Sequence, residues 1–296
     1  MKRLRAFAYH EPDTLRSAIE ALAAECGGAQ LLAGGTDLIV DMKTERIRPS
    51  AVVNLKRVPG LTGIDTVDGG TRIGALTKVT AIEQSQLVQD RYPGLAQAAS
   101  ILASPPIRAL ATIGGNVGRA SPASDLGPAL IVHDAVATIE GRDGVREDLV
   151  EAIYAGPGTT TLASSDVITS FYLPQQPLGF GSAHVKLGKR GSGTDIALAG
   201  ISASVLLGER AEIVACRIAL ASLAPTPLRA LAAEALLRGE APTEAIFAAA
   251  GESVGREAKP IGDMRASASY RTTLAEVLVR RALHGAAAAA GARVAG

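Results

Sequence analysis

Two glycine-rich loops are the residues of this chain best suited to hold a charged ligand. Gly34-Gly35 and Gly114-Gly115 each follow a short apolar run that reads as a strand, and they lie about 80 residues apart. A short polar residue, Thr36 or Asn116, comes directly after each pair. Glycine lets the backbone approach a ligand closely, and successive exposed N–H groups form an anion-binding concavity. Either loop alone is more often a tight turn, but two facing loops could hold a diphosphate between them.

Other nucleotide motifs are absent from the sequence. It contains no G-x-x-x-x-G-K-[ST] run, which excludes a P-loop, and the glycines near position 190 lack the G-x-G-x-x-G spacing of a Rossmann site. Cys26 and Cys216 are too few to ligate an iron–sulfur cluster, so we expect both to be reduced and buried. No acid–base pair or nucleophile accompanies the loops. The sequence therefore predicts no catalytic residue and no metal ligand.

The composition is that of a globular protein of two ordinary domains. Hydrophobic residues make up 47% of the 296 residues, and 30 basic side chains are balanced by 29 acidic ones. This balance, with only 3% aromatic residues, gives no reason to expect a nucleic acid partner. The basic start of the chain lacks the apolar run of a signal peptide, and the alanine-rich tail is too short to span a bilayer. We expect a soluble, cytoplasmic protein.

Apolar periodicity and turn residues predict mixed strands and helices up to Pro174, then a sheet followed by helices. An α+β second domain is expected from that order. Helices are predicted over 15–23, 79–83, 95–102, 121–133, 147–155 and within 227–284. Strands are predicted over 29–32, 51–55, 61–65, 71–75, 110–113, 135–140, 167–173, 182–187, 196–207 and 213–220, and the domain boundary over 175–179.

Several runs resemble the FAD-binding medium subunits of molybdenum hydroxylases, the family of xanthine dehydrogenase and carbon monoxide dehydrogenase. The first loop is similar to the family's first FAD loop, and Ala111-Thr112-Ile113-Gly114-Gly115-Asn116 matches its second loop, A-T-I-G-G-N. Further family-like runs are Ile101–Arg108, Ala120–Leu126 and Lys186–Arg190 with Asp195–Ala197. Some members carry a tyrosine that shields the flavin where this chain has Ile196.

The resemblance implies an α+β fold with two domains. Residues 1–174 would form a two-lobed FAD-binding domain of the PCMH or vanillyl-alcohol-oxidase type, with lobes of about 1–56 and 57–174. Residues 180–286 would form a CO-dehydrogenase-flavoprotein-type C-terminal domain, an antiparallel sheet with helices.

The resemblance also implies which residues contact FAD. The first loop would hold the diphosphate, Thr112, Gly115 and Asn116 would grip it from the second lobe, and Asp125 would meet the nucleotide part. Lys186 would approach the isoalloxazine ring, where a cation stabilises reduced flavin. The implied contacts are Leu32, Ala33, Gly34, Gly35, Thr36, Asp37, Leu38, Leu102, Ala103, Thr112, Gly115, Asn116, Gly118, Asp125, Ile168 and Lys186. From the residues alone, a helix-start charge at Asp125 and a solvated lysine at Lys186 are the commoner explanations.

The implied function is electron transfer. A large partner would carry a molybdenum–pterin cofactor and a small partner two [2Fe–2S] clusters, in a dimer of heterotrimers. FAD in this chain would pass electrons to NAD, a quinone or oxygen. Two alternatives stay open: a stand-alone FAD-dependent oxidase or reductase of the same superfamily, and a non-catalytic nucleotide-binding protein.

Overall fold

The first part of the chain forms a small parallel sheet. The computed structural model describes residues 4–190 and 195–292, so the first three residues of the basic N-terminus lie outside it. Strands β1 (Ala8–His10) and β2 (Ala29–Leu32) both pair in parallel with β3 (Ala51–Asn54), and α2 (Leu38–Lys43) follows β2. Helix α1 (Leu15–Ala24) is capped by Thr14, whose hydroxyl accepts from Ser17 N–H, and its buried face packs on this sheet.

A five-stranded antiparallel sheet follows, in the order β4-β5-β10-β6-β7. Its strands are β4 (Ile64–Val67), β5 (Gly70–Gly74), β6 (Val136–Gly141), β7 (Gly144–Leu149) and β10 (Val167–Pro174). Between β5 and β6 the chain forms α3 (Val79–Gln84), α4 (Gln86–Arg91), α5 (Pro93–Ile101), α6 (Pro105–Arg108), α7 (Ile113–Gly118) and α8 (Leu126–Ile131). The short elements η1 (Leu55–Arg57), η2 (Val150–Ile153), β8 (Tyr154–Gly156) and β9 (Thr159–Thr160) complete this part.

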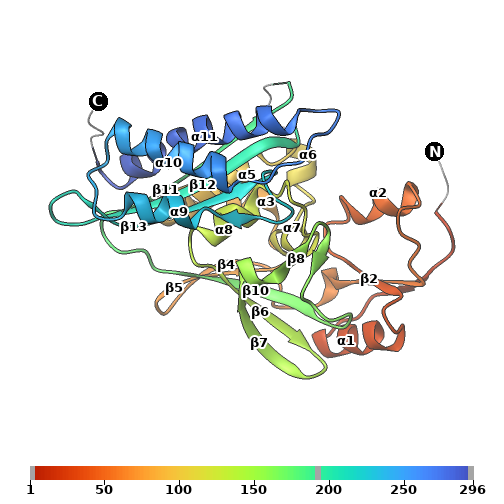
Figure 1. Cartoon of the computed structure of the whole chain (residues 1–296). Coiled ribbons are helices and arrows are strands. Elements are labelled where there is room, and N and C mark those ends of the chain that lie inside the picture. Colours follow the sequence, from red (N-terminus) through yellow and green to blue (C-terminus); the bar gives the residue numbers. More distant parts are fainter. Residues whose placement is uncertain (1–3, 191–194, 293–296) are drawn as a thin grey trace.

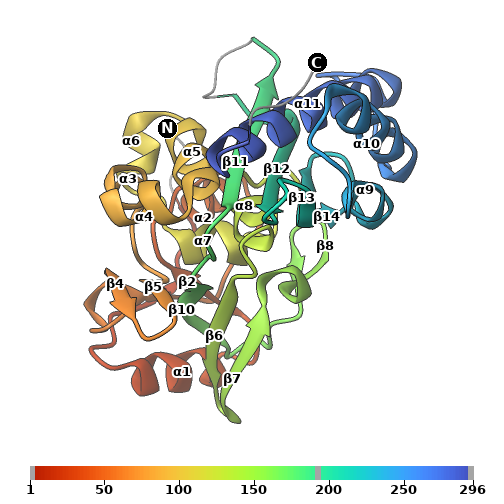
Figure 2. The ribbon, with the colours of Figure 1, turned by 90° about the vertical axis from the view of Figure 1, so that its left-hand side faces the viewer.

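The last part is an antiparallel sheet lined by helices on both faces. Its order is β11 (Phe180–Gly188), β12 (Ala197–Leu207), β13 (Ile213–Ala221) and β14 (Leu228–Arg229). Helices α9 (Leu231–Leu237), α10 (Glu244–Glu257) and α11 (Ala268–Ala289) lie along the outer face, and α5 and α8 lie against the inner one (Figure 1). Figure 2 shows this sheet between α3–α6 on one side and α9–α11 on the other.

Strand alternation assigns the two faces of β11 to different helices. A Cβ at Gly181 would meet the backbone of Ala286 in α11, and Gly285 of α11 lies against Ala183. The intervening positions, Ser182 and His184, contact residues of α5 instead. Because side chains alternate across a strand, the polar residues of β11 are buried where the C-terminal sheet meets the helices of the preceding part.

Several predicted elements differ from the observed ones. Residues 147–155, predicted as a helix, form the end of β7, then η2 and β8, because the backbone of residues 144–149 pairs with β6 in a hairpin. The helix predicted to begin after Ser121 begins only at Leu126, since the Ser121 hydroxyl caps a local turn at Ala123. The strand predicted before the second glycine pair is a turn, with Thr112 making a single bridge to Lys78.

Two smaller expectations can also be compared with the structure. Cys216 is buried as predicted, but Cys26 is exposed, because it lies in a turn with a left-handed φ of 46° after α1. Within the described ranges, none of the helices combines the length and apolar character needed to cross a membrane.

Candidate functional site

The first glycine loop leaves a row of backbone N–H groups free. It runs from the end of β2 to the start of α2, and Gly35 takes a φ of +77° that favours glycine. Among residues 4–190 and 195–292, the N–H groups of residues 34–38 donate no hydrogen bond to another backbone group. Successive N–H groups left free in this way can together bind a ligand that accepts hydrogen bonds, such as an anion.

The two glycine loops adjoin each other. A Cβ added at Gly34 would lie 2.3 Å from the carbonyl oxygen of Leu110 and 3.0 Å from Cα of Ala111. On the other side, a Cβ at Gly115 would lie 3.9 Å from Cβ of Ala33. Only glycine at position 34 allows this approach of two backbones. The loops from the two predicted lobes therefore border one shared region, as a joint site requires.

The second loop differs from the first because its amides are already engaged. Gly114 N–H donates to the Ala75 carbonyl at 2.8 Å, and Asn116 N–H donates to the Thr112 carbonyl at 3.0 Å. Gly115 N–H donates to the Thr112 hydroxyl at 3.1 Å, which makes Thr112 the N-cap of α7. The expectation of two equivalent amide cradles is therefore wrong for this loop, since its glycines form the first turn of a helix.

An ion pair joins the two loops. Arg119, directly after α7, contacts Asp41 of α2 at 2.9 Å through Nη2 and approaches Asp37 at 3.9 Å through Nε. The Asp41 side chain is 7% exposed, and Arg46 reaches its other oxygen at 3.5 Å. Arg119 therefore compensates carboxylates that lie beside the free N–H row, where they would otherwise repel an anion.

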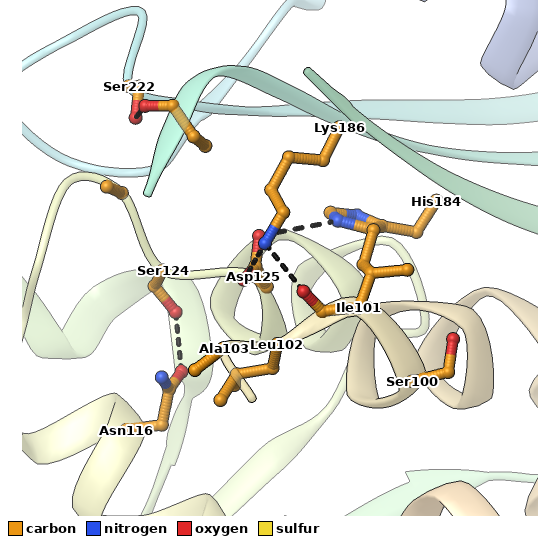
Figure 3. Close-up of polar contacts among 12 residues, drawn as sticks. Ser100, Ile101, Leu102, Ala103, Asn116, Ser124, Asp125, His184, Lys186 and Ser222 are labelled. Carbon is orange, nitrogen blue, oxygen red and sulfur yellow. Dashed lines mark hydrogen bonds and ion pairs between the residues drawn. The ribbon is translucent and has the colours of Figure 1, made fainter. Parts of the chain in front are cut away.

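A buried ion pair lies at the start of α8 (Figure 3). Lys186 Nζ donates to Asp125 Oδ2 at 2.8 Å and to the Ile101 carbonyl at 2.7 Å. The two side chains are 1% and 8% exposed. The simple explanation from sequence is wrong for Lys186, which is not a solvated lysine. Asp125 does lie at the start of α8, as that explanation expects, but its carboxylate pairs with Lys186 and makes no capping hydrogen bond. A buried charge pair of this kind must be held by precise partners.

His184 lies behind this pair, two residues before Lys186 on the same face of β11. Its Nδ1 is 2.8 Å from the Ser202 hydroxyl, and its Nε2 is 3.7 Å from Asp125 Oδ1 (Figure 3). Both Nε2 and Oδ1 are buried and lack a hydrogen-bond partner among the described residues. Unpaired buried polar atoms cost stability, so their retention points to a functional cluster.

The turn at the C-terminal end of α5 is held in an unusual conformation. Ala103 has a φ of +42°, in the left-handed region. Arg108 donates to the carbonyls of Leu102 and Ala103, both at 3.2 Å, and pairs with Glu83 at 2.8 Å. This buried arginine fixes the turn that carries two predicted cofactor contacts. Backbone strain that is held by specific contacts is typical of ligand sites.

The structure brings together most, but not all, of the predicted contacts. Thr112, Gly115, Asn116 and Gly118 lie on α7 or its cap, and Asn116 Oδ1 accepts from Ser124 at 2.6 Å, beside Asp125 (Figure 3). Leu32 lies next to the first loop, where a Cβ at Gly35 would be 2.9 Å from its Cδ1. Ile168 is 7% exposed and packs in the hydrophobic core under α3–α8.

Sequence reasoning missed four residues that organise the site: Arg108, Arg119, Ser124 and His184. Arg119 and His184 act through partners on distant segments, Asp41 and Asp125, and Arg108 and Ser124 act through turns whose shape no local pattern reveals. The exception is His184, because Ser182, His184 and Lys186 alternate along a predicted strand and indicate a polar stripe.

Two family profiles match this chain and together span most of it. Residues 5–176 match the FAD binding domain in molybdopterin dehydrogenase, and residues 183–286 match the CO dehydrogenase flavoprotein C-terminal domain. The carbon monoxide dehydrogenase medium chain of Hydrogenophaga pseudoflava is 34% identical over 95% of this chain and 96% of its own length. The xanthine dehydrogenase FAD-binding subunit of Escherichia coli O157:H7 is 32% identical over 97% and 98%.

Solved structures agree. Carbon monoxide dehydrogenase from Hydrogenophaga pseudoflava, in a form that lacks the Mo-pyranopterin moiety, contains a chain that superimposes with a TM-score of 0.93 at 33% identity. The match covers 97% of this chain and 99% of that one. The α+β fold implied by the resemblance is therefore confirmed.

Proposed function

Because the chain belongs to the family of FAD-binding medium subunits of molybdenum hydroxylases, we propose that it holds FAD as the last electron carrier of such a complex. The observation that carries the proposal is the row of free N–H groups at residues 34–38, beside the second loop. The diphosphate of FAD fits such a row, because it is a dianion with several acceptor oxygens. FAD supplies the redox chemistry, and the chain binds it, orients it and sets its potential.

Residues of the two lobes would contact the diphosphate of FAD from two sides. Ala33, Gly34, Gly35, Thr36, Asp37 and Leu38, with Leu32 beneath, would hold the diphosphate from the first lobe, and Thr112, Gly115, Asn116 and Gly118 would meet it from α7. The side chain of Asn116 is the group of α7 best able to donate, since the α7 amides are engaged.

Asp125 and Lys186 would meet one and the same part of the cofactor. Their charged atoms are 2.8 Å apart, so they cannot serve opposite ends of an extended dinucleotide. We assign both to the flavin end, together with Leu102 and Ala103 on the turn that contains the Ile101 acceptor. Ile168 would contribute from the core beneath. This revises the expected assignment of Asp125 to the nucleotide part.

The wider assembly follows from the relatives. Carbon monoxide dehydrogenase and xanthine dehydrogenase relatives are named as medium or FAD-binding subunits, so this chain would work with a large molybdenum–pterin subunit and a small [2Fe–2S] subunit. We propose a dimer of such heterotrimers in the cytoplasm, passing electrons to NAD, a quinone or oxygen. The domains would be 1–174, with lobes of about 1–56 and 57–174, and 180–286, since β10 ends at Pro174 and β11 begins at Phe180.

A pair of glycine variants tests the cofactor site. Gly35→Asp adds a negative charge to the loop with the free N–H row, and its Cβ would lie 2.9 Å from Cδ1 of Leu32, so purified protein should retain no FAD by absorbance. Gly60→Asp is a matched control: Gly60 has the same φ of +77°, but a Cβ there meets nothing within 4 Å. The control should keep wild-type flavin content. Full flavin content in Gly35→Asp would contradict the assignment of the diphosphate to this loop.

Co-purification tests the role in a complex. The tagged chain, expressed with its natural neighbours, should bring down a large subunit containing molybdenum and a small one containing iron. Turnover of an organic substrate by the isolated flavoprotein would instead favour a stand-alone oxidase or reductase.

A further inference from the structure

One buried side chain of the cofactor region has no role in holding FAD directly. His184 is 4% exposed, and its Nε2 faces Asp125 Oδ1 at 3.7 Å. Asp125 in turn pairs through its other oxygen with Lys186. We propose that His184 is a positioning residue for the Asp125–Lys186 pair and that it takes up a proton when the bound flavin is reduced. The inference rests on the proposed function, in which Lys186 lies at the flavin end.

The geometry selects the protonation state of the Nε2 atom. If Nε2 carried a lone pair, it would face a carboxylate oxygen with no proton between them, which is repulsive. With a proton on Nε2, the contact becomes attractive, and Ser202 can donate its hydroxyl proton to Nδ1 at 2.8 Å. His184 therefore supports Asp125 from behind, as metal-bound and catalytic histidines are oriented by carboxylates.

The same contacts accommodate an imidazolium. The Ser202 hydroxyl can rotate to accept from Nδ1–H, and Asp125 Oδ1 is available to Nε2–H, so both protons of a charged ring find acceptors. His184 can thus gain a proton without leaving a buried donor unpaired.

Charge counting gives the reason for proton uptake. In the oxidised state the pair of Asp125 and Lys186 is neutral overall. Reduction of flavin by two electrons at neutral pH takes one proton to the ring and leaves one negative charge. In a poorly solvated site a new negative charge favours the charged form of a nearby histidine. Two electrons from the donor and two protons from solvent then balance: one proton on the flavin and one on His184.

The surroundings of His184 contain no competing charge in the described contacts. From α8 it faces Asp125, from its own strand Lys186 follows on the same face, and from β12 it meets Ser202. Helix α5 contributes the Gln97 carboxamide, which accepts from His184 N–H at 2.8 Å. Helix α11 packs on the opposite face of β11. The charges that matter are therefore those of Asp125 and Lys186.

The test is the pH dependence of the midpoint potential of FAD bound to the purified protein, from about pH 5.5 to about 8.5, a range that spans the ordinary histidine pKa. Wild type should take up nearly two protons per two electrons over part of this range above neutrality. His184→Asn should take up one there and should be harder to reduce. Absorbance of the reduced flavin separates an anionic ring from a neutral one and so shows which group took the second proton.

Matched controls keep the result specific. His133→Asn removes the other buried histidine of the same interface, which contacts Ser182 rather than Asp125, and should keep the wild-type slope. Equal slopes and potentials in wild type and His184→Asn would overturn the proposal. Failure of wild type to bind FAD would instead contradict the proposed function.

A second measurement covers the case in which His184→Asn does not fold or bind FAD. Nitrogen-15 spectra of wild-type protein, in which the other three histidines are assigned through His10→Asn, His133→Asn and His284→Asn variants, should show His184 changing from neutral to charged when dithionite reduces the flavin. An unchanged His184 signal on reduction would equally overturn the proposal.

Discussion

The two glycine loops look alike in sequence but differ in what they leave free. Residues 34–38 present N–H groups without acceptors, whereas the amides of Gly114, Gly115 and Asn116 all donate within the protein. The proposed role of ligand cradle therefore fits the first loop, whereas the second is a capped helix start beside it. Backbone N–H groups without an acceptor in the protein are the ones that remain available to a ligand.

The two buried histidines beside β11 show the same contrast. His133 has both ring nitrogens engaged, with the Ala129 carbonyl at 2.6 Å and the Ser182 hydroxyl at 2.9 Å. His184 has one engaged nitrogen and one that faces a carboxylate without a bond. His133 joins the two parts of the protein, while His184 adjoins the proposed cofactor contacts Asp125 and Lys186. His184 is thus the histidine of the two whose buried nitrogen still needs an explanation.

The largest effect should come from adding a side chain where the backbones of the two glycine loops touch. Gly34→Ala places a Cβ 2.3 Å from the Leu110 carbonyl oxygen, and neither backbone can yield cheaply. We expect a loss of about 3 kcal/mol in stability, at the upper end for overpacking, and no retained FAD. Gly156→Ala, where a Cβ meets only Thr159 Cβ at 3.9 Å and no FAD contact is proposed, should leave denaturant stability and flavin content unchanged. Equal stability of the two variants would show that the loops do not touch.

Acid should weaken the protein through His133. Burial lowers the pKa of His133 from 6.5 to about 4, so the folded state keeps it neutral while the unfolded state binds a proton. Stability is then full above about pH 6.5 and falls by up to about 3 kcal/mol as the pH drops towards 4. Urea unfolding at stepped pH measures this. His133→Gln should flatten the dependence, and an equally steep loss in that variant would assign it to other groups.

Removal of the ion pair between Arg119 and Asp41 should have a smaller effect on FAD binding, because Arg119 is partly exposed. Arg119→Ala leaves Asp41 beside the free N–H row with less compensation, so FAD should bind about tenfold more weakly, or about 1.4 kcal/mol. Asp41→Asn in the Arg119→Ala background should recover part of that affinity by fluorescence titration. If each change acts independently in this double-mutant cycle, the two side chains do not cooperate.

Removal of the second loop's cap should have the smallest effect. Thr112→Ala leaves Gly115 N–H without its acceptor, which should cost about 1 kcal/mol of stability. Because Thr112 is one of the proposed contacts of the diphosphate, the loosened loop should also weaken FAD binding, but less than the changes above. Thr112→Ser keeps the hydroxyl and should behave as wild type in thermal unfolding. A loss of FAD without loss of stability in Thr112→Ala would mean that the hydroxyl binds the cofactor itself.

Sequence reasoning predicted the family, the α+β class and most strands, because those depend on local apolar periodicity and on glycine motifs. It predicted the three long strands of the last sheet correctly. It failed at 147–155 and before Gly114, where pairing with β6 and capping by Thr112 override the local pattern.

What the sequence by itself determined is which residue types could bind a dinucleotide, and in which order along the chain. Only the tertiary structure decided that one loop keeps its amides free, that Asp125 and Lys186 form a single pair, and that His184 lies behind them. The physical reason is that these properties depend on partners 61 and 18 residues apart, such as Asp125 with Lys186 and His184 with Ser202. Hydrogen-bond partners and burial depend on which segments meet in the folded chain, and local apolar periodicity does not specify that.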